Sequence, residues 1–304
     1  MNPKISICIP AYKQADKLQV LLQSIQQQTF RDFEVIVTDD SPTDEVEKLC
    51  QPQSTFDLKY YKNSVAKGSP DNWNTAISYA KGDWIKLIHH DDYFSSPDAL
   101  QCFMNEATKF PEVDYFYCGT NILDSNNGEQ FPYIVNPNHL NKIAVYPAYL
   151  FHKNLIGAPS TGFFKRSIDL KYDKALIWLV DIEYYNRIIE KHKIINIEQR
   201  LVTTVISEEQ LTTGLKNNRD VEIREFLYCY LKHIERFDSI NRKIMRHRLL
   251  DLFKTFEVND LKDLKSIQSN APIPAFAKLL LFGCSINKPL TYRIFYKLNH
   301  FNIF

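Results

Sequence analysis

The sequence lacks the motifs by which several common enzyme classes are recognised. No GxGxxG segment and no GxxxxGK[ST] loop is present, which removes the main support for a dinucleotide oxidoreductase or a P-loop enzyme. Neither GxSxG nor HExxH occurs, so a hydrolase with a nucleophile elbow and a zinc protease of the HExxH type are also unsupported. The function must therefore be sought in other groups of polar residues.

Cysteine is scarce and scattered. The six cysteines form no CxxC pair and no cluster with histidine, and Cys8 and Cys118 lie in apolar, strand-like runs. A reduced thiol in such a run behaves as a small apolar side chain. The sequence therefore predicts a reducing compartment, with neither a disulfide framework nor a zinc site.

The chain also lacks a charge excess and a long apolar run. Its net charge of +1 over 304 residues does not indicate nucleic-acid binding. No signal peptide is expected, because Met1–Lys4 leads directly into a strand. The most apolar late stretch, Ala275–Cys284, is interrupted by Lys278 and falls short of the ~20 residues that a spanning helix needs.

The last part of the chain is basic and free of acidic residues after Asp263. Five cations follow it: Lys265, Lys278, Lys288, Arg293 and Lys297. A basic tail rich in Leu, Ile, Phe and Tyr is typical of a surface that meets anionic lipid without crossing the membrane. The alternative is that its large apolar residues, among them Phe276, Leu280 and Tyr296, make core or dimer contacts. Both interpretations stay open here.

Strand-like and helical patterns alternate along the first half. Strands are predicted at 5–9, 33–37, 58–61, 84–88 and 113–118, with a helix expected to start at Pro97 and a hairpin turn at Asn126–Gly128. This alternation predicts an α/β fold with a mainly parallel central sheet flanked by helices. From about residue 215 the pattern is helical, so we predict two parts, residues 1–214 and a helical C-terminal extension, residues 215–304.

Two groups of polar residues directly follow predicted strands, where ligands of parallel sheets lie. Asp39 and Asp40 could accept hydrogen bonds from a nucleobase or ribose; the alternative is turn or helix N-cap chemistry. His89-His90-Asp91-Asp92 offers ligands for Mg²⁺ or Mn²⁺, which could in turn hold a diphosphate. The alternative is that Asp92 caps the next helix, but Ser95 or Ser96 would be the better cap if Pro97 starts it.

Asp181 lies at the start of a predicted helix. Its ordinary role there would be an N-cap or a partner of the helix dipole. A carboxylate that stays ionised at a helix start can also serve as general base for an acceptor hydroxyl.

These segments, in this order, resemble the family 2 glycosyltransferases, inverting enzymes with the GT-A fold. The similarity runs from Ile5 to about Gly214, roughly two thirds of the chain. Pro10-Ala11-Tyr12 is similar to the end of the family's opening strand, whose following loop lies over the nucleotide, and Asp39-Asp40 to the segment that holds the base. Lys67, Asn72 and Asn74 match the stretch before the metal motif. The resemblance assigns all of these, and His90, to binding of the nucleotide sugar.

The metal motif and the catalytic base each depart from the family pattern. His89 stands where the family has the first carboxylate of DxD, so the resemblance makes Asp91 the direct metal ligand, helped by His89 or Asp92. Asp181 matches the catalytic base, although Val180 replaces the usual preceding Glu and Glu183 is a less favoured substitute. Ser207 takes the place of a histidine in a late loop, and we assign it no role.

The resemblance implies an inverting transferase that moves a sugar from a nucleotide-diphosphate donor to a saccharide or lipid-linked saccharide, using Mn²⁺ or Mg²⁺. The expected nucleotide of the donor is UDP. The expected setting is bacterial surface polysaccharide synthesis (O-antigen, capsule or lipooligosaccharide), in the cytoplasm or peripherally on the inner face of its membrane, with a homodimer left open. Two alternatives remain. The departures at His89 and Val180 would suit a non-catalytic nucleotide-sugar-binding scaffold, and a nucleotidyltransferase would need a glycine-rich loop that Ala11–Gln14 does not provide.

Overall fold

The computed structural model describes residues 2–51, 55–134, 136–208, 214–215, 217–268 and 272–301. By its internal contacts the chain forms two compact units. The first comprises Met1–Asn136 and Ile156–Gln210, and the second comprises Pro137–Leu155 and Leu211–Phe304.

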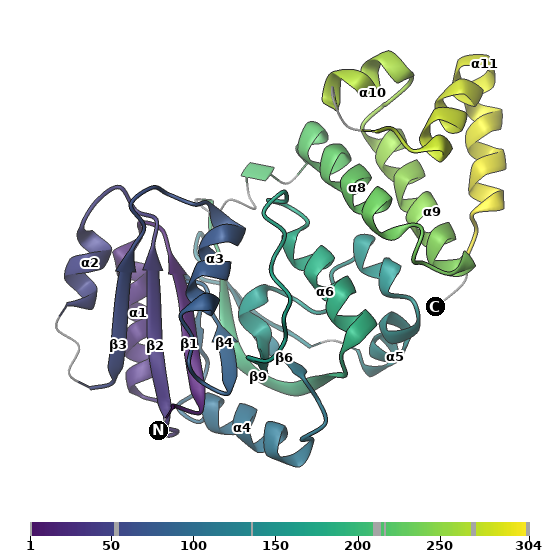
Figure 1. Ribbon diagram of the computed structural model, residues 1–304. Coiled ribbons are helices and arrows are strands. Elements are labelled where there is room, and N and C mark those ends of the chain that lie inside the picture. Colours follow the sequence, from purple (N-terminus) through teal and green to yellow (C-terminus); the bar gives the residue numbers. More distant parts are fainter. Residues whose placement is uncertain are drawn as a thin grey trace. The chain divides into compact units, whose positions relative to one another are not determined.

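The first unit is built on a nine-stranded mixed sheet (Figure 1). Its main path runs β3-β2-β1-β4-β8-β6-β9-β5, and β7 pairs with β6. The first four strands of this path are mutually parallel, as predicted, whereas β8 is antiparallel to both β4 and β6. The strands are β1 (Ile5–Ala11), β2 (Phe33–Asp39), β3 (Asp57–Lys62), β4 (Trp84–Leu87), β5 (Tyr93–Phe94), β6 (Tyr115–Asp124), β7 (Gln130–Tyr133), β8 (Gly162–Lys165) and β9 (Ile194–Ile206).

Helices cover both faces of this sheet, with α3 in front of the strands and α1 behind them in Figure 1. The helices of the unit are α1 (Ala15–Gln26), α2 (Glu45–Cys50), α3 (Ser69–Ser78), α4 (Ala99–Lys109) and α6 (Val180–Lys191), with a 3-10 turn η2 (Pro159–Thr161). In α1, Leu18, Leu21, Leu22 and Ile25 are buried. This helical spacing puts one apolar stripe against the sheet.

Two predicted boundaries are wrong, and both involve proline. Pro10 does not end the first strand, because β1 continues to Ala11. Beyond Cys8, β1 pairs with β2 alone, so a residue without an N–H group is tolerated on the open side. Pro97 does not start a helix either, since α4 begins at Ala99 with Asp98 at the N-cap position. The Pro97 carbonyl instead accepts a hydrogen bond from Thr29 N at 2.7 Å.

The second unit is helical and includes a segment that the sequence analysis counted within residues 1–214. Its elements are α5 (Pro137–Val145), η1 (Pro147–Phe151), α8 (Arg219–His233), α9 (Ser239–Thr255), α10 (Leu261–Ile267) and α11 (Ala275–Leu298). The inserted segment 137–155 packs on α9, where the Asn241 side chain accepts a hydrogen bond from Ala148 N at 3.1 Å. The predicted boundary falls in a stretch of which residues 209–213 and 216 lie outside the described part. The functional division at residue 214 stays a prediction.

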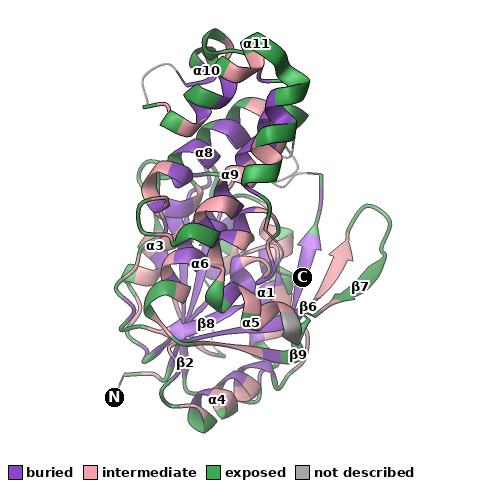
Figure 2. Ribbon diagram, turned by 90° about the vertical axis from the view of Figure 1, so that its right-hand side faces the viewer, coloured by how far each residue is buried: buried purple, intermediate pink, exposed green. Residues whose placement is uncertain are grey.

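Helix α11 carries the predicted basic tail and bends at Asn287, two residues before Pro289. Leu280 and Tyr292 are buried, as expected of core contacts, whereas six other large apolar side chains are exposed (Figure 2): Leu279, Phe282, Ile286, Leu290, Ile294 and Leu298. Among the residues described, no helix has the length and apolar character that crossing a membrane requires.

Candidate active site

The predicted site residues that follow β1, β2 and β4 meet at one edge of the sheet. β1 lies between β2 and β4, and Ala11 at its end pairs with Asp39 at the end of β2. The backbone N–H of Ile88, just after β4, donates to Cys8 O of β1 at 3.0 Å. The loops after β1, β2 and β4 therefore leave the sheet side by side, where ligands of such sheets bind.

The two carboxylates after β2 organise the neighbouring loops. Asp39 is fully buried and accepts hydrogen bonds from Ser41 N at 2.7 Å, Tyr60 Oη at 2.7 Å and Lys62 Nζ at 2.8 Å. Burial by itself would raise the pKa of Asp39, but these hydrogen bonds outweigh burial and hold the pKa below its ordinary value. Asp39 is therefore a fixed negative charge at the end of β2.

Asp40 binds the loop that leads into α3. Its Oδ2 accepts hydrogen bonds from Lys67 N at 3.1 Å and Gly68 N at 3.0 Å, and its Oδ1 from Asn63 Nδ2 at 2.7 Å. Gly68 has a φ of 81°, a backbone conformation that favours glycine. Contact of either Asp39 or Asp40 with a nucleotide stays a prediction.

The two predicted asparagines of α3 hold chain segments together. Asn72 is buried and its Nδ2 donates to Thr38 O at 3.1 Å and Ala11 O at 3.4 Å, which ties the ends of β2 and β1. Asn74 exchanges two hydrogen bonds with the backbone of Tyr172, at 2.8 and 2.9 Å. Lys67 donates from Nζ to Thr75 Oγ1 at 2.9 Å.

The loop after β1 is strained and exposes an aromatic ring. Lys13 and Gln14 have φ values of 55° and 50°, a region that residues with a side chain seldom adopt. Tyr12 is 49% exposed, so its ring is available to stack on a planar ligand. Such backbone strain clusters at binding sites, where the surrounding structure maintains it. The resemblance assigned this loop to the nucleotide.

His90 connects this loop to the residues after β4. Its Nε2 lies 3.2 Å from Gln14 Oε1. Burial lowers the pKa of His90, so its imidazole is predominantly neutral at neutral pH. His90 therefore positions the loop over the site.

His89, Asp91 and Asp92 form the group of candidate metal ligands. One ligand atom of each lies within 4.8 Å of the other two. The Nε2 atom of His89 is buried and has no hydrogen-bond partner. Burial lowers the pKa of His89 to about 4, so the ring is neutral and can present a lone pair. An orphaned imidazole nitrogen beside two carboxylates fits a divalent cation with mixed nitrogen and oxygen ligands.

Asp92 does not cap the next helix, so that alternative is wrong. The N-cap position of α4 is taken by Asp98. Asp92 is buried and its Oδ1 accepts a hydrogen bond from Val205 N of β9 at 3.0 Å. Burial, with the nearby charge of Asp91, raises the pKa of Asp92 well above its ordinary value. A cation would favour the ionised form that coordination needs.

The sequence analysis missed Lys86 and Ser160, which support this group. Ser160 is buried, and its Oγ accepts a hydrogen bond from His89 N at 2.9 Å. Lys86, in the middle of β4, donates to Ser160 O and, at 3.2 Å, to Gly162 O. Lys86 is buried and its ammonium lies 4.9 Å from the centre of the Phe103 ring. Lys86 could have been found, because a lysine within the apolar run 84–88 is unusual. No feature of the sequence pointed to Ser160.

Lys17 is a further residue that the sequence did not single out. It lies in the first turn of α1 and donates to Ser207 Oγ at 3.2 Å. Its charge contributes to the lowered pKa of His90, after burial, which places it near that ring. The later residues of the loop that begins at Ser207 lie outside the described part from 209 to 213.

Asp181 lies in the first turn of α6, where its Oδ1 accepts a hydrogen bond from Ile182 N at 2.8 Å. The pKa values of Tyr115, Tyr172 and Tyr185 are raised, first by burial and also by the charge of Asp181. Asp181 therefore lies near a group of tyrosine side chains.

Glu183 is a less suitable base. It is buried and binds Arg187 through both carboxylate oxygens, with Nε–Oε1 at 2.8 Å and Nη2–Oε2 at 2.7 Å. An ion pair of this geometry holds the carboxylate in place and occupies both of its oxygens.

A chain of aromatic contacts connects α6 to the candidate metal ligands. The Trp73 ring centre is 4.5 Å from that of His89 and 5.1 Å from that of Tyr172. The Tyr172 ring stacks on Tyr184 at 4.0 Å, and Tyr184 follows Asp181 by one helical turn. His89 and the start of α6 are therefore joined through two rings.

The chain is similar in sequence and fold to known proteins. The family model described as "Glycosyl transferase family 2" matches residues 6–172, more than half of the chain. The chain belongs to glycosyl transferase family 2. An uncharacterized glycosyltransferase of Haemophilus influenzae is 26% identical over 182 residues, 60% of this chain and 60% of that protein. The match to that family confirms the assignment that the motif order suggested.

Two more similarities bear on this family 2 chain. The Escherichia coli UDP-Glc:alpha-D-GlcNAc-diphosphoundecaprenol beta-1,3-glucosyltransferase WfaP is 32% identical over 90 residues, 30% of this chain and 36% of that protein. The crystal structure of S. aureus TarS 1–349 in complex with UDP-GlcNAc superposes with a TM-score of 0.65 at 15% identity, covering 97% of this chain and 90% of that one. This structural likeness confirms the GT-A type α/β fold with C-terminal helices.

Proposed function

We propose that this family 2 chain is an inverting glycosyltransferase that moves a sugar from a UDP-linked donor to a saccharide or lipid-linked saccharide acceptor. The carrying observation is the group of His89, Asp91 and Asp92 within 4.8 Å at the end of β4. Its neighbours are the strained loop after β1 and the charges after β2, which suit the nucleotide part of such a donor.

His89, Asp91 and Asp92 are the residues that would hold the divalent ion. The site fits such an ion because the buried Nε2 atom of His89 has no hydrogen-bond partner and could coordinate it. Bound Mn²⁺ or Mg²⁺ would supply Lewis-acid stabilisation of the negative charge on the departing diphosphate. The ammonium of Lys17 and the start of α1 add positive potential on the same side.

In the proposed displacement, the Asp181 carboxylate accepts the proton of the acceptor hydroxyl. The acceptor oxygen forms a bond to the anomeric carbon, and the bond from that carbon to the diphosphate oxygen breaks. The electron pair leaves with the nucleoside diphosphate. Positioning and electrostatics supply most of the acceleration in such a transfer.

The test is release of UDP from a panel of UDP-sugars by the purified chain with Mn²⁺, compared with an Asp91→Ala variant. We expect the wild type to release UDP and the variant to lose metal-dependent turnover. Asp169→Asn, which alters an exposed carboxylate of the same unit, serves as control. Turnover by Asp91→Ala at the wild-type rate would show that Asp91 has no role in the reaction.

The alternative of a non-catalytic scaffold is tested in the same samples. A scaffold would raise its unfolding temperature in the presence of UDP, because ligand binding to the native state stabilises it, yet release nothing from any donor. Measurable binding with no turnover, across donors and candidate acceptors, would favour the scaffold. The names of the relatives favour the enzyme, since the E. coli relative is named a glucosyltransferase.

The same name motivates the lipid-linked acceptor, because it specifies a diphosphoundecaprenol substrate for that protein. We propose that α11 brings this chain to the anionic face of the membrane that carries such an acceptor. The support is one helix with six exposed apolar side chains and the exposed cations Lys278, Lys288, Arg293 and Lys297. Apolar residues beside cations suit a surface of anionic lipid.

A further inference from the structure

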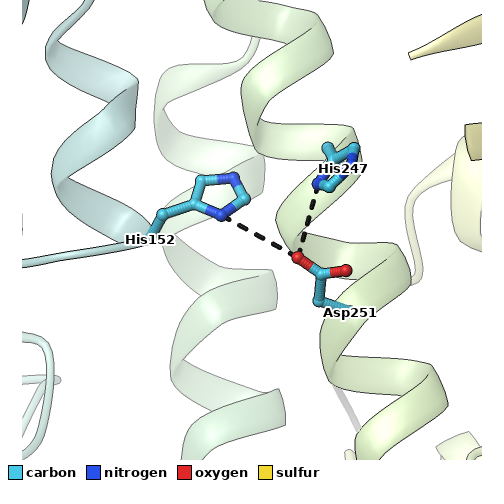
Figure 3. A group of neighbouring side chains, drawn as sticks. All are labelled: His152, His247 and Asp251. Carbon is cyan, nitrogen blue, oxygen red and sulfur yellow. Dashed lines mark ion pairs between the residues drawn. The ribbon is translucent and has the colours of Figure 1, made fainter. Parts of the chain in front are cut away.

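Three side chains from two distant stretches of sequence converge in the helical unit (Figure 3). His152 directly follows η1, whereas His247 and Asp251 lie one turn apart on α9. One ligand atom of each residue lies within 4.8 Å of the other two. In Figure 3 both imidazole rings turn a nitrogen towards the carboxylate of Asp251.

The hydrogen bonding of His152 leaves a lone pair on the nitrogen that faces Asp251. Its Nε2 lies 3.0 Å from the carbonyl oxygen of Ile244, and a carbonyl can only accept, so Nε2 carries the proton. Its Nδ1 lies 3.9 Å from Asp251 Oδ2. A second nitrogen bound to a backbone carbonyl is the usual arrangement of a metal-ligating histidine.

His247 and Asp251 are similarly oriented. His247 Nδ1 lies 3.3 Å from Asp251 Oδ2, but it is buried and makes no hydrogen bond of acceptable geometry. The other carboxylate oxygen of Asp251 accepts a hydrogen bond from Tyr296 Oη at 2.9 Å, which fixes the carboxylate plane. A buried polar atom without a partner is costly, and a cation shared by these atoms would remove that cost.

The site is partly exposed, with the Asp251 side chain 33% accessible, and a positive charge lies near it. The Phe301 ring centre lies 5.6 Å from that of His152 and 5.1 Å from that of His247, so this ring covers part of both imidazoles. The nearby guanidinium of Arg248 disfavours a cation, but it lies 3.8 Å from Glu222, which offsets part of its charge.

We propose that His152, His247 and Asp251 bind a zinc ion. Two imidazole nitrogens and one carboxylate oxygen suit Zn²⁺ better than Mg²⁺ or Mn²⁺, which prefer oxygen. With bonds of roughly 2.0–2.1 Å, ligand atoms of a tetrahedral zinc are about 3.3–3.4 Å apart. The two imidazole nitrogens lie 3.3 and 3.9 Å from Asp251 Oδ2, and one ligand atom of each residue lies within 4.8 Å of the others, so binding would require an inward movement of His152. Water would complete the coordination.

The proposed ion would join the inserted segment 137–155 to α9. This role is independent of the proposed transferase site, because all three ligands belong to the helical unit. The sequence analysis expected no zinc site because no cysteine and histidine cluster exists in the sequence. The three ligands come together only through the packing of η1 on α9.

The test measures zinc on the full chain carrying Asp91→Ala, a substitution that removes the proposed transferase-site ion. After chelator treatment and dialysis against ZnCl₂, we expect one bound equivalent by elemental analysis, and with CoCl₂ the visible absorption bands of four-coordinate Co²⁺. Zinc at a hundred times its dissociation constant should raise the unfolding temperature by on the order of 5 °C.

Adding His247→Ala or His152→Ala should remove the bound equivalent and the cobalt bands. His247→Gln keeps the side-chain volume and should behave in the same way, and its circular dichroism without metal reports whether the unit is folded. His192→Ala, which removes another histidine beside an aspartate, Asp114 at 3.1 Å, should retain the zinc. Absence of bound zinc, or zinc that survives both His152→Ala and His247→Ala, would overturn the proposal whether or not the chain transfers sugar.

Discussion

The indole ring of Trp73 lies against the imidazole of His89, with ring centres 4.5 Å apart and an interplanar angle of 41°. Trp73 comes from α3 and also touches Tyr172, so a single side chain contacts both His89 and the aromatic group next to α6. The orientation of His89 therefore depends on a residue outside the metal motif.

Replacing Trp73 should weaken metal binding although none of the proposed metal ligands is substituted. We expect Trp73→Ala to lower Mn²⁺ affinity about 10–100-fold, the usual range for loss of a residue that orients a ligand. Trp73→Phe retains an aromatic face and should stay within a few-fold of wild type. Titration with Mn²⁺, followed by the paramagnetic signal of the free ion, measures both. Equal affinity in Trp73→Ala and wild type would contradict this role.

Replacing the proposed base should slow the transfer step alone. Asp181→Asn keeps the shape of the side chain and its hydrogen bond from Ile182 N, but it cannot accept a proton from the acceptor. We expect the turnover number to fall about 10²–10⁴-fold, with UDP affinity and Mn²⁺ affinity unchanged. Steady-state kinetics and calorimetry separate these effects. A wild-type rate in Asp181→Asn would exclude Asp181 as the base.

Asp39 should stabilise the fold in a pH-dependent manner. Its pKa in the folded state is below the ordinary 3.8, so its contribution is complete above about that pH and is lost as the pH falls further. We expect Asp39→Asn to cost about 2–4 kcal/mol of unfolding free energy at pH 7. The difference from wild type should shrink below about pH 4.

Urea unfolding at several pH values measures this difference. Asp57→Asn is the matched control, because the Asp57 side chain is 60% exposed and its ion pair with Lys59 should contribute at most about 1 kcal/mol. A cost for Asp39→Asn that grows as the pH falls would have the wrong sign for this explanation.

Lys86 should contribute to stability through the two carbonyl groups that it binds. Lys86→Met fills the same volume but leaves the carbonyls of Ser160 and Gly162 without this donor. We expect a loss of about 2–4 kcal/mol in urea unfolding. Lys81→Met, at an exposed position, should change stability by less than about 0.5 kcal/mol. Equal stability of the two variants would show that the buried ammonium is dispensable.

The proposed membrane contact should depend on charge. Each cation near an anionic surface contributes about 1 kcal/mol, so Lys278→Gln combined with Arg293→Gln should weaken binding to phosphatidylserine-containing vesicles about 30-fold. Lys262→Gln, on α10, is the control. Vesicle sedimentation at low and high salt measures the effect. Salt-independent binding, or a dimer that buries α11 in solution, would favour the alternative interpretation of this tail.

The sequence predicted the first half of the fold well because local patterns control it. Apolar runs placed β1, β2 and β4 within a few residues of their observed bounds. Prediction failed where contacts between distant residues set the bounds of an element. Pro97 was predicted to start a helix, but its carbonyl accepts a hydrogen bond from Thr29 N and the helix begins later.

The candidate metal ligands His89, Asp91 and Asp92 could be predicted because they are adjacent in sequence and follow a buried strand. The residues that contact these ligands could not be predicted, since Ser160 and Trp73 come from other parts of the chain. The hydrogen bonds of Asp39 and Asp40 were likewise invisible, because their partners lie on β3 and in the loop before α3.

The sequence by itself determined the family, the α/β core and the order of the polar segments, because each depends on residues that are close along the chain. Tertiary structure alone decided that the segment 137–155 packs with the C-terminal helices, and that His152 meets His247 and Asp251. Contacts between distant residues follow from how whole elements pack, and no local pattern encodes that packing.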